Sequence, residues 1–240
     1  MKVAIIGVGL IGGSLALKLR EKKFANQFSG IDQSGEHLQE ALDLGIIDIA
    51  ENLENGVKNA DLIIVAIPVD ATVKILPQVL DLISEKQTVM DVGSTISLFV
   101  TAMKSHPKRK RYVAFHPMWG TENSGPKSAQ RESFSGRAAV ICDKEDSAED
   151  AFSLVEKVAK TLEMNTIFMA SEAHDVHTAY ISHISHITSY ALANTVLEKE
   201  REEDTIFQLA SSGFSSTVRL AKSHPEMWVP IFKQNKENVL

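Results

Sequence analysis

A glycine-rich turn between an apolar run and a helical pattern constrains the fold of this chain more than any other feature. The chain opens with KVAII, a β-branched run typical of a strand buried on both faces, and continues directly into Gly7-Val-Gly9-Leu-Ile-Gly12. In this pattern Gly7 permits a tight turn, Gly9 lets the backbone approach a pyrophosphate, and Gly12 lets the next helix pack against the strand. The free N–H groups at the helix start, around Leu10 and Ile11, then bind the phosphates. The turn therefore predicts a dinucleotide-binding site.

The same pattern requires an acidic residue about twenty positions later, after a second strand, to bind the adenosine ribose hydroxyls. Asp32 occupies this position and follows a short predicted strand at 28–31. Gln33 and Ser34 come next, in place of an arginine or lysine that pairs with a 2′-phosphate. We therefore expect NAD rather than NADP as the cofactor.

Short apolar strands alternate with helices as far as residue 169, which predicts a parallel sheet. The carboxyl ends of its strands, at Gly7, Asp32, Pro68 and the turn from Asp91 to Ser94, are expected to share the edge where open α/β sheets bind ligands. We therefore predict a Rossmann-type doubly wound domain over residues 1–169, with Pro68 and Ser94 beside the cofactor. The expected strands are 2–6, 28–31, 62–67, 88–91, 112–115, 138–142 and 166–169, and the expected helices are 11–20, 36–44, 71–82, 95–103 and 148–162.

The strand pattern ends near residue 170, so we predict an all-helical second domain over 170–240. A long apolar helix without glycine or proline is expected from 172 to 198, buried on several sides. Further helical segments are expected at 205–210 and 217–222, a turn at 211–214, and a last helix from Pro225 to Leu240. Because this helix has no stop signal, we expect that the native domain continues or that a disordered tail is missing.

Composition excludes several classes of protein. The net charge is −6, which disfavours nonspecific binding to nucleic acid or anionic membranes, and the basic run at 108–111 is interpreted as a solvated turn. Cys142 is the only cysteine, which excludes an intramolecular disulfide and a cysteine-based metal cluster. No apolar run approaches membrane-spanning length, and the first residues enter a core strand directly. We therefore expect a cytoplasmic protein.

A dinucleotide domain followed by a helical domain suggests a dehydrogenase with its substrate between the two, which requires a base and an anion-binding group. His116 closes an apolar strand and precedes a proline, as a site residue on a rigid element does, although it could equally satisfy a backbone group. Arg219 lies in an apolar helical turn, where a guanidinium requires a partner. That partner is either a substrate carboxylate or a nearby glutamate.

Four histidines lie within thirteen residues of the long predicted helix. At about 100° per residue, His174 and His177 lie on one side, and His183 and His186 lie on another. The four histidines therefore cannot form one cluster within a single helix. No carboxylate shares a face with His183 and His186 at ligand spacing, so we expect no metal site.

With these residues in view, the chain resembles the prephenate dehydrogenases of tyrosine biosynthesis over essentially its whole length. The resemblance depends on GVGLIGGS, on HPMWGTENSG at 116–125, on SHISH at 182–186, on the stretch from Gly213 to Arg219, and on Met227-Trp228. It implies NAD-dependent oxidative decarboxylation of prephenate to 4-hydroxyphenylpyruvate without a metal. Hydride passes from C4 to NAD, and carbon dioxide leaves because the ring becomes aromatic.

The resemblance also implies roles for individual residues. His116 corresponds to the catalytic histidine that hydrogen-bonds the 4-hydroxyl of the substrate, and Ser94 to the serine that orients it near the nicotinamide. Arg219 corresponds to the arginine that binds the substrate carboxylate. The remaining substrate-binding candidates are Thr121, Glu122, His183, His186 and Trp228, the last supplied by the neighbouring subunit of a homodimer formed through residues after Ser171.

Two departures from the family pattern bear on substrate preference. Ile184-Ser185 replaces the commoner leucine-proline, and Trp119 stands where a small residue is usual. The alternatives are an arogenate dehydrogenase, which the sequence does not separate from the main interpretation, and a dinucleotide-binding regulator without turnover. A β-hydroxy acid or imine reductase would need a lysine near the start of the long helix, and none occurs between Lys160 and Lys199.

Overall fold

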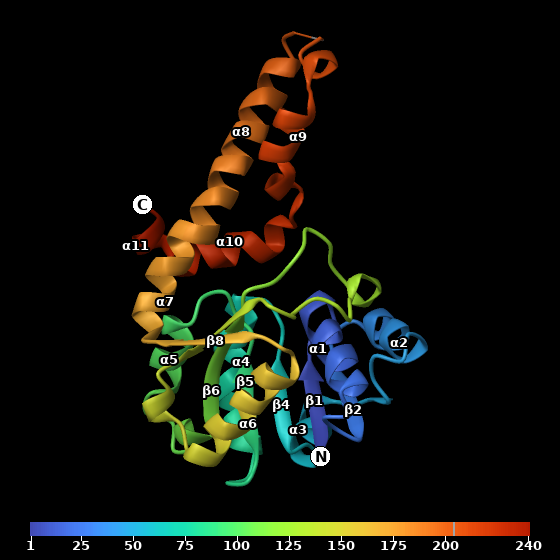
Figure 1. Cartoon of the computed structure of the whole chain (residues 1–240), viewed down its shortest axis with the longest axis vertical. Coiled ribbons are helices and arrows are strands. Elements are labelled where there is room, and N and C mark those ends of the chain that lie inside the picture. Colours follow the sequence, from blue (N-terminus) through green and yellow to red (C-terminus); the bar gives the residue numbers. More distant parts are fainter. Residues whose placement is uncertain (204) are drawn as a thin grey trace.

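The structure is a computed structural model that describes residues 1–203 and 205–240, and its larger part is a layered α/β domain (Figure 1). One eight-stranded sheet has the order β3-β2-β1-β4-β5-β6-β7-β8, in which only the β6/β7 pair is antiparallel. The order reverses between β1 and β4, as in a doubly wound Rossmann sheet, and this confirms the predicted fold class. The strands are β1 (Lys2–Ile6), β2 (Gln27–Ile31), β3 (Ile49–Ala50), β4 (Leu62–Val65), β5 (Thr88–Asp91), β6 (Tyr112–Pro117), β7 (Ala138–Cys142) and β8 (Asn165–Met169).

Alternate side chains of the buried strands divide the core into two layers, one on each face of the sheet. Val3 and Ile5 of β1 pack with helices α1, α2 and α6, whereas Ala4 and Ile6 pack with α3, α4 and α5. This period of two is what a strand covered on both faces requires. The six helices are α1 (Leu10–Glu21), α2 (Gly35–Asp43), α3 (Leu53–Asn59), α4 (Val69–Leu82), α5 (Ser97–Met103) and α6 (Glu149–Thr161).

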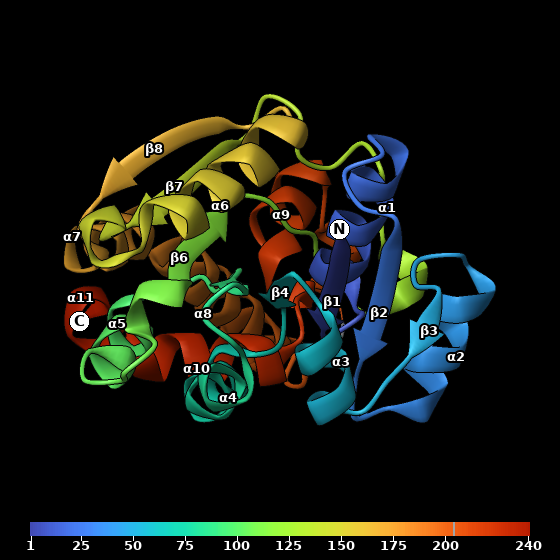
Figure 2. The same cartoon turned by 90° about the horizontal axis from the view of Figure 1, so that it is seen from below.

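The chain after β8 is helical and forms an arm that projects from the α/β domain (Figure 1). Seen from below, along the arm, its helices lie behind the strands (Figure 2). Helix α8 rises away from the sheet, α9 lies beside it, and α10 crosses its base. Trp228 and Ile231 of α10 join the core layer formed by α3, α4 and α5, so the last helices return to the first domain. The segments are α7 (Ser171–Thr178), a π-helical segment (Ala179–His183), α8 (Ile184–Glu200), α9 (Ser212–Thr217), α10 (Pro225–Gln234) and α11 (Lys236–Val239).

The structure corrects several sequence-based expectations in this arm. The long helix is interrupted by the π-helical segment, and α8 is largely exposed, with Ser189 as its only buried residue. Residues 211–214 do not form a turn, because α9 begins at Ser212; the segment 205–210 contains only a short 3₁₀ turn at Phe207–Leu209. The last predicted helix is divided at Asn235 into α10 and α11. The polar run from Glu198 to Asp204, which we expect to end the long helix, closes at Asp204, and this residue lies outside the described residues.

Two elements of the α/β domain carry no sequence signal. β3 has two exposed residues, and α3 (LENGVKN) is a short helix with only Leu53 and Val57 as large apolar residues. Val57 is fully buried in the core layer on this face of the sheet, and Leu53 packs against that layer. A Cβ at Gly56 would meet the side chain of Ile31 at 2.6 Å, so the close approach of α3 combines a glycine with a small apolar contact.

The basic run at 108–111 is structural and not a solvated turn. Arg109 and Arg111 are buried, and Arg111 donates to both carboxylate oxygens of Asp150 at 2.7 and 2.8 Å. Arg109 donates to the backbone oxygen of Tyr112 at 2.8 Å. These guanidinium groups tie the start of β6 to the neighbouring elements.

No helix within the described residues is long and apolar enough to cross a membrane.

Candidate active site

The glycine-rich turn has the backbone geometry that the sequence predicts. Gly7 has a φ of +94°, and a Cβ there would clash with the carbonyl oxygen of Ala66. A Cβ at Gly12 would clash with the carbonyl oxygen of Gly7, which shows how closely α1 approaches β1. Gly9 is open, with only the backbone nitrogen of Gly125 within 4 Å of a Cβ position. The turn therefore leaves room for a ligand at the start of α1.

Neighbouring elements complete this edge of the sheet. Gly9 is the N-cap of α1 and makes no side-chain capping bond, so the first N–H groups of the helix, from Leu10 and Ile11, are free to donate. Pro68 is the N-cap of α4 and lies three residues after the end of β4, the strand beside β1. The two helix starts therefore flank the point where the strand order reverses.

Asp32 lies at the end of β2 and is anchored to the glycine-rich turn. Its carboxylate accepts from the backbone N–H of Val8 at 3.2 Å and from that of Ser34 at 2.9 Å. His37 lies 3.8 Å away through Nδ1. A carboxylate has about four lone-pair sites, so two remain to accept from ribose hydroxyls.

His116 closes β6 and is the first member of a hydrogen-bonded triad formed by His116, His174 and Asp175. The Nδ1 atom of His116 lies 2.8 Å from Nε2 of His174, and Nδ1 of His174 lies 2.8 Å from Oδ1 of Asp175. The Asp175 carboxylate also accepts from the backbone N–H groups of Ile96 and Ser97, at 2.8 and 3.0 Å. All three side chains of the triad are at most 9% exposed.

The contact between His116 and His174 joins residues 58 positions apart and has no local sequence signal. The helical-wheel prediction for the histidines of the arm fails for another reason, because it assumes an uninterrupted α-helix. Residues nine apart, such as His174 and His183, lie about 180° apart on an α-helix. A π-helical turn holds about one residue more than an α-helical turn, which rotates the following residues by roughly 100°. The segment at Ala179–His183 therefore turns His183 toward the side occupied by His174, and the expectation that these histidines lie apart is wrong.

Burial favours the neutral forms of His116 and His183. Burial, together with the nearby His174 and His183, lowers the pKa of His116 well below its usual range. Burial also lowers the pKa of His183 to about 4. The amide nitrogen of Asn235 donates to the carbonyl oxygen of Asp175 at 2.7 Å and lies 3.0 Å from Nδ1 of His183. A neutral His116 is suited to accept a proton.

Asp91 fixes the backbone on both sides of this site. It is fully buried and accepts from the hydroxyl of Tyr112 at 2.8 Å, from the N–H of Gly93 at 2.8 Å and from the N–H of Phe115 at 3.2 Å. One carboxyl group therefore connects the turn that carries Ser94 to the strand that ends in His116. Burial raises the pKa of Asp91 to about 7.

Several predicted substrate-binding residues meet where the loop after β6 approaches the arm. Arg219 lies with its Nη1 3.6 Å from Oε2 of Glu122, which follows Thr121 in that loop. The imidazole of His186 stacks on Trp228, with ring centroids 3.4 Å apart. Burial lowers the pKa of His186, and the charge of Arg219 lowers it further.

The expectation that Arg219 lies in an apolar environment is wrong, because its side chain is 57% exposed. Trp119 packs edge-on against Phe134 at 5.3 Å, in the core layer below the loop. Orientation of His116 by Ser94 stays a prediction, since the partner of His116 Nδ1 in the structure is His174.

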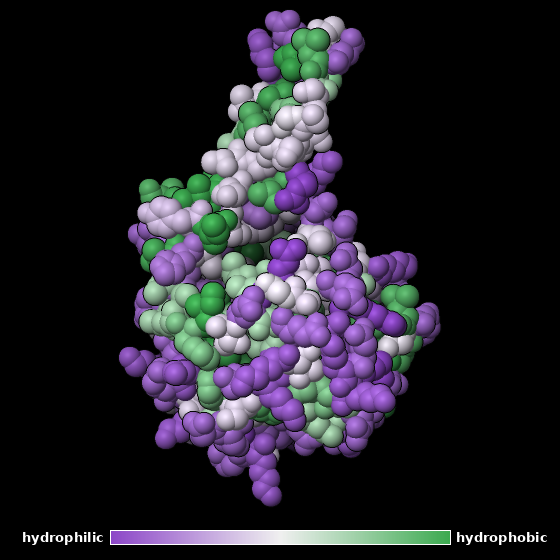
Figure 3. All heavy atoms as spheres, in the orientation of Figure 1, coloured by the Kyte–Doolittle hydropathy of each residue, from purple (hydrophilic) through white to green (hydrophobic). Residues whose placement is uncertain are grey.

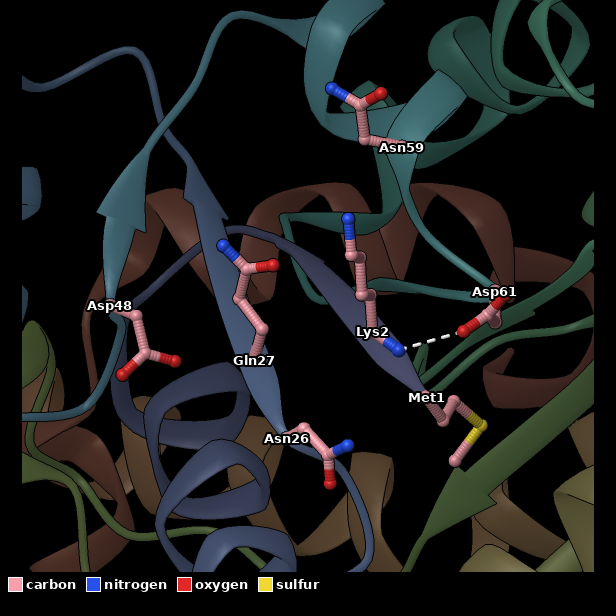
Figure 4. A pocket seen from close by; sticks show the side chains of 7 residues that line it. All are labelled: Met1, Lys2, Asn26, Gln27, Asp48, Asn59 and Asp61. Atoms are coloured by element: carbon pink, nitrogen blue, oxygen red, sulfur yellow. Dashed lines mark hydrogen bonds between the residues drawn. The ribbon is translucent and has the colours of Figure 1, made fainter.

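A hollow of about 660 Å³ lies on the opposite edge of the sheet (Figure 4). Its lining includes Lys2 and Gln27, the first residues of β1 and β2, and its internal hydrogen bond joins the N–H of Lys2 to Asp61 at 2.7 Å. The hollow contains none of the predicted site residues. Across residues 1–203 and 205–240, no group of three or more histidine, cysteine, aspartate or glutamate side chains is arranged to bind a metal ion.

The fold and the site together define a two-part protein of the dinucleotide-binding class, with a Rossmann-type sheet followed by helices. Residues 15–168 match the family model described as "Prephenate dehydrogenase, nucleotide-binding domain", and residues 170–240 match "Prephenate dehydrogenase, dimerization domain". The chain belongs to the prephenate dehydrogenase family.

Individual relatives agree with this assignment. The chain is 32% identical to the prephenate dehydrogenase of Bacillus subtilis (strain 168), over 99% of this chain and 65% of that protein. It is 30% identical to that of Lactococcus lactis subsp. cremoris (strain MG1363), over 100% of this chain and 66% of the relative. The crystal structure of prephenate dehydrogenase from A. aeolicus in complex with hydroxyphenyl propionate and NAD+ matches with a TM-score of 0.91 and 32% identity, covering 100% of this chain and 84% of that chain. The chain spans slightly less than two thirds of the length of the two curated relatives.

Proposed function

We propose that the protein catalyses the NAD-dependent oxidative decarboxylation of prephenate to 4-hydroxyphenylpyruvate. The observation that carries this proposal is a buried, neutral His116 at the end of a strand of a dinucleotide-binding sheet. Family membership favours prephenate as the substrate, and the open position at Gly9 with the anchored Asp32 fits NAD. NAD, when bound, accepts a hydride from C4 of the substrate.

The protein groups then have distinct tasks. His116 accepts the proton of the 4-hydroxyl group, because its depressed pKa keeps the imidazole neutral near pH 7. Arg219 binds the side-chain carboxylate of the substrate, since its exposed guanidinium faces the loop that carries Thr121 and Glu122. Once C4 is oxidised, the ring carboxylate leaves as carbon dioxide and the ring becomes aromatic. No step of this sequence requires a protein-bound metal.

The direct test follows the absorbance of NADH while the purified protein is incubated with NAD and prephenate, and then with NAD and arogenate. Turnover with prephenate is the expected result. Turnover with arogenate alone would assign the chain to the alternative substrate. No reduction of NAD with either compound would refute the enzyme hypothesis and leave a dinucleotide-binding regulator.

We also propose that the arm forms a homodimer. Apolar side chains remain exposed along it, including Tyr180 at 71%, Ile181 at 72% and Leu209 at 85%, and the space-filling view shows hydrophobic surface over the arm (Figure 3). Helices that leave such residues in water require a partner surface. The match of this segment to a dimerization domain supports a second copy of the chain as that partner.

Trp228 packs against His186 of its own chain and is 6% exposed. A contribution of Trp228 to the partner's site, which the family resemblance implies, stays a prediction. A cytoplasmic location is proposed on the single cysteine, Cys142, which is a buried free thiol.

A further inference from the structure

We propose that His174 is a positioning residue that sets the tautomer of His116, with Asp175 as the anchor, so that the lone pair facing the substrate hydroxyl is on Nε2 of His116. This inference rests on the proposed role of His116 as the base. It follows from the order of hydrogen bonds in the triad.

The order of donors starts at Asp175. Its carboxylate already accepts from the backbone N–H groups of Ile96 and Ser97, and a carboxylate has only acceptor capacity. Nδ1 of His174, 2.8 Å from Oδ1 of Asp175, must therefore carry a hydrogen and donate it. Tautomers are assigned from such partners. A neutral His174 protonated on Nδ1 has its lone pair on Nε2.

The same reasoning then applies to His116. Its Nδ1 lies 2.8 Å from the lone pair on Nε2 of His174, so Nδ1 of His116 donates. A neutral His116 that donates through Nδ1 has an unprotonated Nε2. This is the nitrogen required to accept a proton, and the opposite tautomer would present an N–H to the substrate hydroxyl.

The arrangement also suits the charged state. When Nε2 accepts a proton, both ring nitrogens of His116 become donors, and the bond from Nδ1 to His174 is unchanged. The carboxylate of Asp175, at the far end of the triad, offsets the positive charge in this buried site. No side chain has to rotate during the proton transfer.

The triad connects the helical arm to the α/β domain. His174 and Asp175 lie in α7 of the arm, whereas His116 ends β6 and the N–H groups of Ile96 and Ser97 follow the turn that carries Ser94. His174 is 1% exposed, and both of its ring nitrogens have partners inside the protein. Docking α7 on the sheet therefore selects the tautomer of the base.

The experiment uses the full chain with ¹⁵N-labelled histidine side chains, in which long-range ¹H–¹⁵N spectra distinguish protonated from unprotonated ring nitrogens. Signals of the eight histidines are assigned with single-histidine variants. At neutral pH, His116 is expected to be protonated on Nδ1 and unprotonated on Nε2. In His174→Phe, which removes the acceptor, His116 is expected to shift to the Nε2–H form.

Kinetics provide the second readout. His174→Phe is expected to lower kcat by about 10²- to 10⁴-fold, the range expected for a wrong tautomer, with KM for the substrate changed less than about twofold. His174→Gln retains an oxygen that accepts from Nδ1 of His116 and is expected to recover at least about tenfold of that loss. His177→Gln, an exposed histidine three residues away on the same helix, is the control and is expected to match the unmodified protein in both readouts.

The outcomes separate this inference from the proposed function. A His116 protonated on Nε2 in the unmodified protein, or a tautomer unchanged by His174→Phe, would overturn the inference even with full activity. Absence of turnover with prephenate and arogenate would refute the proposed function, while the spectra would still decide the tautomer. If circular dichroism shows that His174→Phe does not fold, Asp175→Leu, which removes the acceptor of His174 Nδ1, replaces it, with the same shift of the His116 tautomer expected and an unchanged tautomer counting against the inference.

Discussion

Replacing Arg219 by glutamine is expected to weaken substrate binding without slowing the chemical step. A charge-assisted hydrogen bond to a carboxylate contributes about 1.5–3 kcal/mol. The Arg219 side chain is 57% exposed, so solvent and salt screen its charge and favour the lower end of this range. About 1.5 kcal/mol corresponds to a rise in KM for prephenate of roughly tenfold, with kcat and NAD affinity nearly unchanged.

The contact between Arg219 and Glu122 allows two further variants to test this role of Arg219. At 3.6 Å and partly exposed, this ion pair contributes less than about 1 kcal/mol, so a substrate carboxylate can displace it at little cost. Glu122→Gln removes the competing carboxylate and is expected to change KM by less than about fivefold. Arg219→Lys retains the charge but loses the planar guanidinium fork, so its KM is expected between those of the unmodified protein and Arg219→Gln.

Initial rates of NADH formation at several prephenate concentrations measure both constants. The matched control is Lys222→Gln, which removes an exposed positive charge at the other end of the same 3₁₀ helix, Arg219–Lys222. A KM that does not rise in Arg219→Gln, or that rises equally in Lys222→Gln, would refute a specific carboxylate contact. Added salt is expected to raise KM in the unmodified protein and to have less effect in Arg219→Gln.

Four further results are expected. His116→Asn should lower kcat by roughly 10²- to 10⁴-fold with little change in KM, and because the pKa of His116 is lowered, activity of the unmodified protein should fall only at acidic pH; normal kcat in the variant would exclude the base role. Asp32→Ala should weaken NAD binding and relieve repulsion of the NADP phosphate, whereas equal efficiency with both cofactors in the unmodified protein would contradict the ribose contact. Burial raises the pKa of Asp91 from 3.8 to about 7, so the folded protein holds the Asp91 proton more tightly than the unfolded chain does. The resulting contribution to the free energy of unfolding is fully present below about pH 4 and is lost as the pH rises through 7. The melting temperature of Asp91→Asn should therefore vary less between pH 5 and 8 than that of the unmodified protein, and an equal pH dependence would argue against this titration. Light scattering at micromolar concentration should give the mass of a dimer, and a monomer mass would count against the arm as the interface.

The sequence predicts those parts of the fold in which local pattern and tertiary environment agree. Each of the seven expected strands is present, since a strand covered on both faces must be apolar along its length, as LIIV in β4 is. The roles of Gly7 and Gly12 follow from the same logic, because a Cβ at either position would clash with backbone. β3 and α3 are not predicted because β3 has only two residues, both exposed, and α3 has only Leu53 and Val57 to form an apolar pattern.

The arm is predicted less well, because the sequence does not show which of its apolar side chains are covered within a single chain. The long apolar helix suggests burial on several sides, yet within one chain Tyr180 and Ile181 are mostly exposed. An apolar pattern indicates that a surface will be covered but does not indicate by which chain. The expectation of burial is therefore wrong for the single chain, and the proposed dimer supplies the cover.

In the candidate site, helical periodicity does not predict which histidines lie close together. Both His116 and the histidines of the long helix are visible in the sequence, but their relation depends on one π-helical segment at Ala179–His183 that no local pattern reports. An uninterrupted α-helix would place His174 and His183 about 180° apart, and only one of them would then face His116. With the π-helical segment both approach it, one through a hydrogen bond and the other through its effect on the pKa. Because π-helical turns are rare and occur frequently at functional sites, the irregularity itself is consistent with a helix shaped to bring His183 to the side occupied by His174.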